Sequence, residues 1–241
     1  MEYATLFKLI MPALATQRLP ILLGGTSNHF RIAVLREIGA WDPYNMTEDA
    51  DLGLRLARAG YSTRALNSIT YEEANPKFGN WLQQRSRWLK GFLQTWLVHM
   101  RNPILLGQDV SFDGFWAMQA MTLGLFVSAL FHPFLLGDSA YLILSGTLAS
   151  QAISLPMFIV AGLDIAVLFA GYAFSIYAGY CALRRKKIKG WWFALATMPA
   201  YWMLISLAGW MALWQFLVKP FHWNKTEHGL SRFQHYLPPR N

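Results

Sequence analysis

Two short groups of polar residues have the types and spacing to perform chemistry on a hydroxyl group. The first is Thr47-Glu48-Asp49, which begins a segment with helical spacing. A carboxylate at a helix N-terminus is held by free backbone N–H groups and by the helix dipole, so it stays ionised and fixed. Such a carboxylate can accept the proton of an attacking hydroxyl. Taken alone, the same three residues favour a simpler role, which is to cap the helix.

The second group is Gln84-Arg85-Ser86-Arg87-Trp88, on a longer predicted helix. Residues three and four apart share a helix face, so Gln84, Arg87 and Trp88 project together. They offer an amide, a guanidinium that can engage phosphate through two hydrogen bonds, and an aromatic plane. This combination can hold a sugar and a diphosphate. An interfacial helix with snorkelling arginines would carry the same residues.

The order of the two groups resembles a known signature. TED, followed about 35 residues later by QxxRW and then by apolar spans, is similar to the pattern of membrane-embedded, processive family 2 glycosyltransferases such as cellulose and hyaluronan synthases. The resemblance implies that Asp49 is the general base that deprotonates the acceptor hydroxyl, with Thr47 and Glu48 in support. It also implies that Gln84, Arg87 and Trp88 bind the acceptor sugar and the donor diphosphate.

Two further segments are similar to loops of the same enzymes. Gly24-Gly25-Thr26-Ser27-Asn28 resembles a loop on the acceptor side, where the glycines allow close approach of the backbone and Ser27 and Asn28 supply hydrogen bonds. A plain turn fits these residues almost as well. The segment from Trp223 to Gly229 resembles the gating loop FxVTxKG of cellulose synthases, and the alternative is a solvated turn. In that alignment the loop residues are Trp223, Lys225, Thr226 and His228.

The elements that must position these residues differ between the two ends of the chain. Helical spacing occurs at Tyr3–Leu14, Phe30–Ile38, Glu48–Ala59 and Phe78–His99. Strands are predicted at Ile21–Gly25 and Thr63–Tyr71. Thr47 or Asn45 is expected to cap the helix at Glu48, and Gly60 to follow its last turn. The first part therefore predicts an α/β fold, which the resemblance identifies at residues 1–76 as the C-terminal part of a GT-A catalytic domain.

The later part predicts an α-helical transmembrane region. The chain is 54% hydrophobic, and its apolar runs are long enough to cross a bilayer, which takes about 20 helical residues. We expect an amphipathic interfacial helix at 77–110, three to four transmembrane helices at 111–219, and a cytoplasmic gating-loop-like tail at 220–241. For the helix at 77–110 the alternative is packing on the soluble core. The span candidates are Phe115–Leu136, Ala140–Leu183 as one or two spans, and Trp191–Val218 with a kink at Pro199.

The placement of positive charge predicts topology. The net charge is +8, but no nucleic-acid recognition motif accompanies it, so nucleic acid is not an expected partner. A basic cluster at 184–189 lies between apolar runs, and such loops mark the cytoplasmic face. The gating-like loop must also face the cytoplasm. Both hold only if Trp191–Val218 does not cross the membrane as one simple span.

The predicted function is inverting transfer of a sugar from a nucleotide-sugar donor to a saccharide or lipid-linked acceptor, in polysaccharide synthesis. We expect an integral protein of the bacterial inner membrane with its catalytic part in the cytoplasm, contacting membrane lipids and synthase partner subunits. The resemblance implies Mg²⁺ or Mn²⁺, held mainly by a nucleotide-binding half for which the residues before Thr47 are too few. We therefore expect a truncated chain. The alternatives are an inactive scaffolding remnant of a synthase and a transporter fragment.

Overall fold

The protein is almost entirely helical wherever its structure is described. The computed structural model describes residues 2–68, 70, 72, 74–146, 154–184 and 191–220. These residues are 75% helical and contain no strand or sheet. The predicted α/β fold class is therefore wrong, and neither Ile21–Gly25 nor the described residues of Thr63–Tyr71 form a strand.

The segment Ile21–Gly25 shows why the strand prediction failed. Ile21 and Leu22 are buried, as a strand in a sheet would be. Their cover is helix α4 (Glu48–Arg58), because a Cβ added to Gly53 of that helix would lie 2.1 Å from the Ile21 carbonyl oxygen. A short apolar run is buried in either setting, and periodicity alone does not distinguish a paired strand from a segment packed on a helix.

The chain divides into two compact units. One comprises Met1–Ala13 and Val127–Ser206, and the other comprises Leu14–Phe126 and Leu207–Asn241. The second unit contains both groups of polar residues. Its main helices are α3 (Ile32–Glu37), α4 (Glu48–Arg58), α5 (Phe78–His99), α6 (Pro103–Gln119) and the π-helix η2 (Ala120–Gly124).

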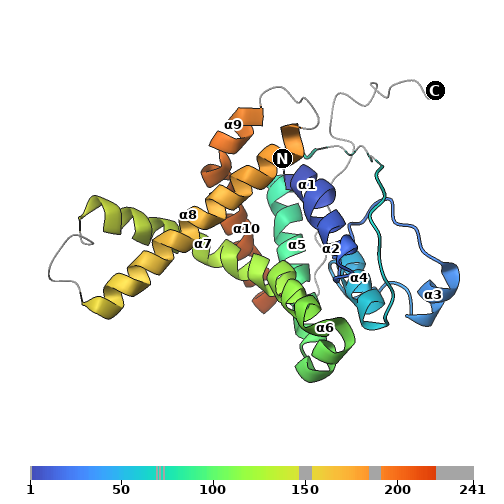
Figure 1. The fold of residues 1–241 in the computed structure, drawn as a ribbon. Helices are drawn as coiled ribbons and strands as arrows, with labels where there is room; N and C mark the ends of the chain where they lie inside the picture. Colours follow the sequence, from blue (N-terminus) through green and yellow to red (C-terminus); the bar gives the residue numbers. More distant parts are fainter. Residues whose placement is uncertain are drawn as a thin grey trace, which may run out of the picture. The chain divides into compact units, whose positions relative to one another are not determined.

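The core of the second unit lies where α4, α5 and α6 pack together (Figure 1). Its buried residues are Leu22, Ala50, Leu54, Leu106, Val110 and Met118. The predicted helix Phe78–His99 is confirmed at both ends, and α4 ends one residue before its predicted limit. Gly60 follows α4 with a positive φ of 78°, as predicted for the residue after a last helical turn.

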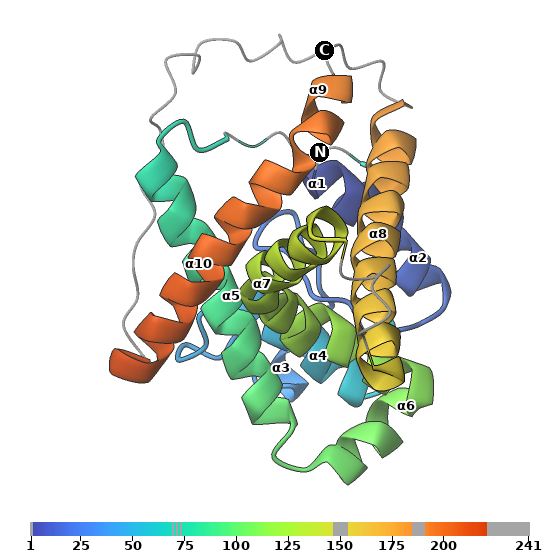
Figure 2. The same cartoon turned by 90° about the vertical axis from the view of Figure 1, so that its left-hand side faces the viewer.

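The first unit holds most of the apolar helices. It contains α1 (Glu2–Thr5), η1 (Leu6–Ile10), most of α7 (Leu125–Leu144), α8 (Leu155–Arg184), α9 (Trp191–Ala196) and the start of α10 (Met198–Val218). The short helix α2 (Met11–Thr16) follows η1 at the boundary between the units. Helices α1 and η1 pack against α8 (Figure 2). Polar pairs join α7 to α8, with His132 Nε2 2.7 Å from Tyr172 Oη and Ser139 donating to Asp164 at 3.4 Å.

Three helices among the described residues are long and apolar enough to cross a membrane. They are Pro103–Leu144, which joins α6, η2 and α7, then Leu155–Arg184 and Met198–Val218. Helix α8 is uninterrupted, which agrees with the prediction of one span rather than two in this part of the chain. Pro199 does not kink a helix, because it lies in the first turn of α10, where proline is tolerated, and the break falls at Thr197.

Candidate active site

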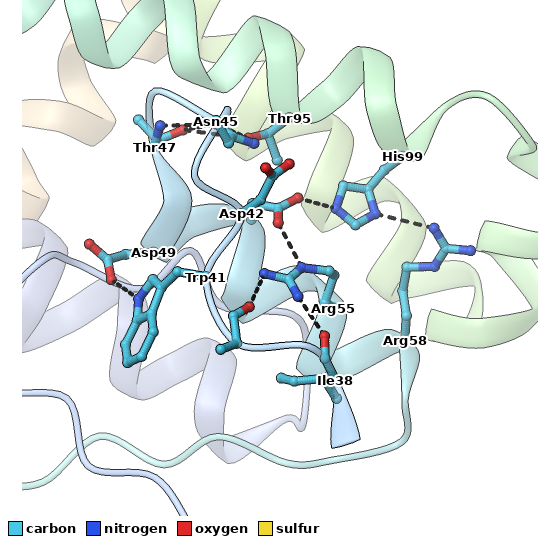
Figure 3. A network of polar contacts seen from close by, with 12 residues as sticks. Ile38, Trp41, Asp42, Asn45, Thr47, Asp49, Arg55, Arg58, Thr95 and His99 are labelled. Atoms are coloured by element: carbon cyan, nitrogen blue, oxygen red, sulfur yellow. Dashed lines mark hydrogen bonds and ion pairs between the residues drawn. The ribbon is translucent and has the colours of Figure 1, made fainter. Parts of the chain in front are cut away.

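The carboxylate of Asp49 lies between an indole N–H group and a glycine backbone. Trp41 Nε1 donates a hydrogen bond to Asp49 Oδ1 at 2.7 Å (Figure 3). A Cβ added to Gly25 would lie 3.0 Å from Asp49 Oδ2, so a side chain there would crowd the carboxylate. The structure thus brings Asp49 together with the glycine segment that we predicted on the acceptor side.

The polar side chains of that glycine segment are engaged in local hydrogen bonds. Ser27 Oγ lies 2.6 Å from Thr70 Oγ1, and Thr26 donates to Glu72 at 2.6 Å. Asn28 Nδ2 donates to the Gly24 carbonyl oxygen. These bonds hold the loop beside Asp49. The predicted role of Ser27 and Asn28 in acceptor binding stays a prediction.

The turn before α4 is fixed onto α5 by Asn45 and Thr47. Asn45 Oδ1 accepts from the Thr47 N–H at 2.9 Å, and Asn45 Nδ2 donates to Thr95 Oγ1 at 2.9 Å. Thr47 occupies the N-cap position of α4, but its side chain makes no capping hydrogen bond. It packs against Gly91 instead, where an added Cβ would lie 2.5 Å from Thr47 Cγ2. The absence of a side chain at Gly91 therefore lets the start of α4 approach α5.

Glu48 and Arg87 connect the two predicted motifs electrostatically. Burial raises the pKa of the Glu48 carboxyl, while its own backbone N–H and the nearby Arg87 charge oppose that shift. Burial also lowers the pKa of Arg87, and the Glu48 charge opposes this change. The half-buried guanidinium of Arg87 therefore lies near the helix turn that carries Asp49.

Gln84 and Trp88 have other neighbours on α5. Gln84 Oε1 accepts a hydrogen bond from Asn75 Nδ2 at 3.0 Å. The guanidinium of Arg85 lies over the Trp88 ring, 4.5 Å from its centroid, and 5.8 Å from that of Trp81. Arg85 thus stacks on aromatic rings and is only 8% exposed. The sequence analysis did not predict this burial.

The predicted gating-loop residues Trp223, Lys225, Thr226 and His228 lie outside the described residues. The chain just before them is held by α5. Lys90 Nζ donates to the Lys219 carbonyl at 3.3 Å, and Gln94 Nε2 donates to the Pro220 carbonyl at 2.8 Å. Lys90 is 1% exposed, and burial lowers its pKa. The chain therefore leaves α10 beside the helix that carries Gln84, Arg87 and Trp88.

Asp51, the second acid of the Asp49-Ala50-Asp51 sequence, is buried. Its network includes Arg55 and His99, which are labelled in Figure 3. Asp51 accepts hydrogen bonds from Arg55 Nε at 2.7 Å and His99 Nε2 at 3.0 Å. Because His99 Nδ1 faces an Arg58 nitrogen at 3.3 Å, this ring nitrogen accepts and Nε2 carries the proton. Burial acts to raise the pKa of Asp51, but the bonds from His99 and Arg55 outweigh it and hold the pKa below its usual value.

The described residues contain no group of three or more His, Cys, Asp or Glu side chains that could hold a metal ion. Asp51 is already bonded to Arg55 and His99. The donor set expected for Mg²⁺ or Mn²⁺ is therefore not assembled in this part of the chain.

Two contacts of the site were not predicted from the sequence. Trp41 precedes Asp49 by eight residues in an irregular segment, and only its polar N–H group marked it as a candidate partner. Gly91 lies inside a helix, where glycine costs about 1 kcal/mol relative to alanine. That cost is a usable signal, since a glycine kept in a helix often marks close packing.

Sequence comparisons relate the chain to known proteins. The model of the family described as glycosyl transferase family group 2 matches residues 6–224. Over 68 residues the chain is 32% identical to the "Probable glycosyltransferase YdaM" of Bacillus subtilis (strain 168). That stretch is 28% of this chain and 16% of the Bacillus protein, so the match spans a small part of the relative's length. No solved structure matches the chain.

Proposed function

Because the chain belongs to glycosyl transferase family group 2, we propose that it transfers a sugar from a nucleotide-sugar donor to a saccharide or lipid-linked acceptor at a membrane. The observation that carries this proposal is the position of Asp49. Its carboxylate is hydrogen-bonded by Trp41 and lies against the Gly25 backbone, on a helix whose first turn lies near Arg87. A fixed carboxylate can act as the base of an inverting transfer, and a nearby guanidinium can balance the charge of the leaving diphosphate.

In the proposed reaction Asp49 is the general base. It takes the proton of the acceptor hydroxyl as that oxygen attacks the anomeric carbon of the donor sugar. The new carbon–oxygen bond forms while the bond to the nucleoside diphosphate breaks, and the leaving group departs with the bonding electron pair. One displacement of this kind inverts the anomeric configuration.

The remaining residues act on binding and on developing charge. Arg87 stabilises the negative charge of the leaving diphosphate, which grows in the transition state. Gln84 and Trp88 hold the acceptor sugar, and the residues Trp223, Lys225, Thr226 and His228 close over the nucleotide. A bound Mg²⁺ or Mn²⁺ would neutralise diphosphate charge, with its ligands outside the described residues.

The proposed setting is the inner membrane of a bacterium, with the catalytic part in the cytoplasm and polysaccharide synthesis as the outcome. Three helices long and apolar enough to span a membrane support membrane association. The nucleotide-sugar donor is a cytoplasmic metabolite, so α4 and α5 would face that side. Membrane lipids and synthase subunits are the further partners of this proposal.

A donor screen tests the function. Membranes containing the protein are given radiolabelled uridine and guanosine diphosphate sugars in turn, with and without saccharide and lipid acceptors. We expect one donor to release nucleoside diphosphate in an acceptor-dependent manner and to label the acceptor. Correctly inserted protein that releases none from any donor would contradict the proposal and favour a scaffolding role.

A further inference from the structure

A pocket of about 390 Å³ lies beside Trp41 in the second unit. Its charged wall comes from one face of α4, because Asp51, Arg55 and Arg58 follow one another at helical spacing. Asp49 projects from a different face, since residues two apart point to roughly opposite sides of a helix. Trp41 connects the pocket to Asp49, because it lines the pocket and donates its indole hydrogen to the Asp49 carboxylate.

The cations of this pocket are already neutralised by the protein. Arg55 is paired with Asp51 at 2.7 Å, and Arg58 is paired with Asp109 at 2.8 Å. A site for a diphosphate needs positive charge that the protein has not already balanced. The pocket therefore disfavours the nucleotide part of the donor. Its charged walls equally disfavour the hydrocarbon chain of a lipid.

Two groups in the pocket remain suited to a ligand. Trp41 is 41% exposed and presents an aromatic surface. Asp42 Oδ1 accepts the Tyr44 N–H at 2.9 Å, and its second oxygen has no hydrogen bond within the described part of the chain. An apolar ring face packs on an indole, and a carboxylate oxygen accepts hydrogen bonds from hydroxyl groups. A neutral, hydroxyl-rich ring satisfies both groups.

We propose that this pocket is an acceptor subsite for a neutral saccharide, with Trp41 as its stacking surface and Asp42 as the acceptor of its hydroxyl hydrogen bonds. The proposal rests on the proposed transfer function and selects a saccharide over a lipid as the acceptor. The volume lies within the range of about 300–1,000 Å³ typical of small-molecule pockets. Trp41 lines the pocket and is bonded to Asp49, so an acceptor chain that packs on Trp41 could extend toward the base.

The binding test uses the whole 241-residue chain in detergent and needs no turnover. Neutral tetrasaccharides of glucose, N-acetylglucosamine and mannose are titrated by saturation-transfer NMR. We expect at least one to bind the wild type, and Trp41→Ala and Asp42→Asn each to weaken it at least tenfold. Trp116→Ala and Asp113→Asn, which replace exposed residues of the same types outside the pocket, should change binding less than threefold.

A conservative variant separates binding from catalysis. Trp41→Phe keeps the aromatic surface but removes the donor to Asp49, so tetrasaccharide binding should stay within threefold while the transfer rate falls about tenfold. Wild-type binding that survives in both pocket variants would overturn the subsite, as would the absence of any tetrasaccharide binding. Either result leaves the transfer function standing if the donor screen succeeds. Saccharide binding lost in the pocket variants supports the subsite even if that screen fails.

Discussion

Asp49 and Asp51 are two residues apart and have different chemical settings. Asp49 is bonded by Trp41 beside a glycine loop, whereas Asp51 is 3% exposed and bonded by Arg55 and His99. Both oxygens of Asp51 are bonded by basic side chains, whereas Asp49 Oδ2 lies beside the exposed backbone of Gly25. We therefore propose that Asp49 acts in the reaction and that Asp51 stabilises the fold. Substitution of Asp49 should then lower the transfer rate, and substitution of Asp51 should lower Tm.

Asp51→Asn should reduce stability, because it removes one member of the network that Asp51 forms with Arg55 and His99 in the pocket wall. Breaking a buried ion pair on one side costs about 3–5 kcal/mol. The folded-state pKa of Asp51 lies below the ordinary value for aspartate, so its contribution to stability is present above that ordinary value and is lost as pH falls through the folded pKa. Thermal unfolding of the detergent-solubilised protein should show a lower Tm for the variant at pH 7 and a smaller deficit below pH 4.

Asp113→Asn is the control for this stability experiment, because Asp113 is exposed. Its Tm should match the wild type at every pH. A deficit for Asp51→Asn that is equally large at pH 7 and at pH 3 would contradict the assignment of Asp51 as an ionised member of the buried network.

At the scale of elements, the site depends on how closely α4 approaches α5. Gly91 allows that approach, because any side chain there would overlap Thr47. Asn45 and Thr95 then fix the turn by hydrogen bonds. Packing of this kind transmits a change on α5 directly to the helix turn that carries Asp49.

Gly91→Ala should therefore lower both stability and transfer. The added methyl group would lie 2.5 Å from Thr47 Cγ2, and overpacking of a tight contact typically costs about 1–3 kcal/mol. We expect a lower Tm and a transfer rate reduced about tenfold, measured on the same membrane preparation.

Gly79→Ala is a matched control on the same helix, because nothing lies within 4 Å of a Cβ added there. Alanine is the better helix former by about 1 kcal/mol, so the control should keep its activity and gain slightly in Tm. Equal effects of the two substitutions would show that the α4–α5 contact does not position the site.

How far the sequence predicts these elements depends on the range of the interactions. The bounds of α4 and α5 follow from local signals, namely helical spacing and Gly60 after the last turn of α4. The burial of Lys90 does not, because Lys90 donates a hydrogen bond to the Lys219 carbonyl, which is 129 residues away. The false strand at Ile21 has the same origin, since only the tertiary partner decides how a short apolar run is buried.

At the scale of the whole molecule, the membrane topology depends on the side of the membrane at which α10 ends. The sequence predicted that residues 184–189 and the segment after α10 both face the cytoplasm. Hydrogen bonds from Lys90 and Gln94 hold the Lys219 and Pro220 carbonyls at α5. These hydrogen bonds favour a topology in which the C-terminal end of α10 lies on the same side of the membrane as the predicted catalytic residues.

Reporter fusions check this topology. An alkaline phosphatase or fluorescent reporter fused after Pro220 should report the same side as one inserted after Gly60. A reporter at Lys187 should agree with both if α10 does not cross the membrane as one simple span. Gln94→Ala together with Lys90→Met would weaken the attachment of the α10 end without altering the apolar helices. A reporter at Pro220 on the opposite side from Gly60 would contradict the proposed arrangement.

The central claim is that Asp49 is the base of a glycosyl transfer site, and the rate of transfer by Asp49→Asn tests it most directly. Loss of a positioned general base typically reduces a rate by about 10²–10⁴-fold. With the donor found by the screen, we expect a fall of about 10³-fold, while membrane insertion, Tm and the activity of Asp113→Asn stay at wild-type values. Transfer by Asp49→Asn at the wild-type rate would contradict the account.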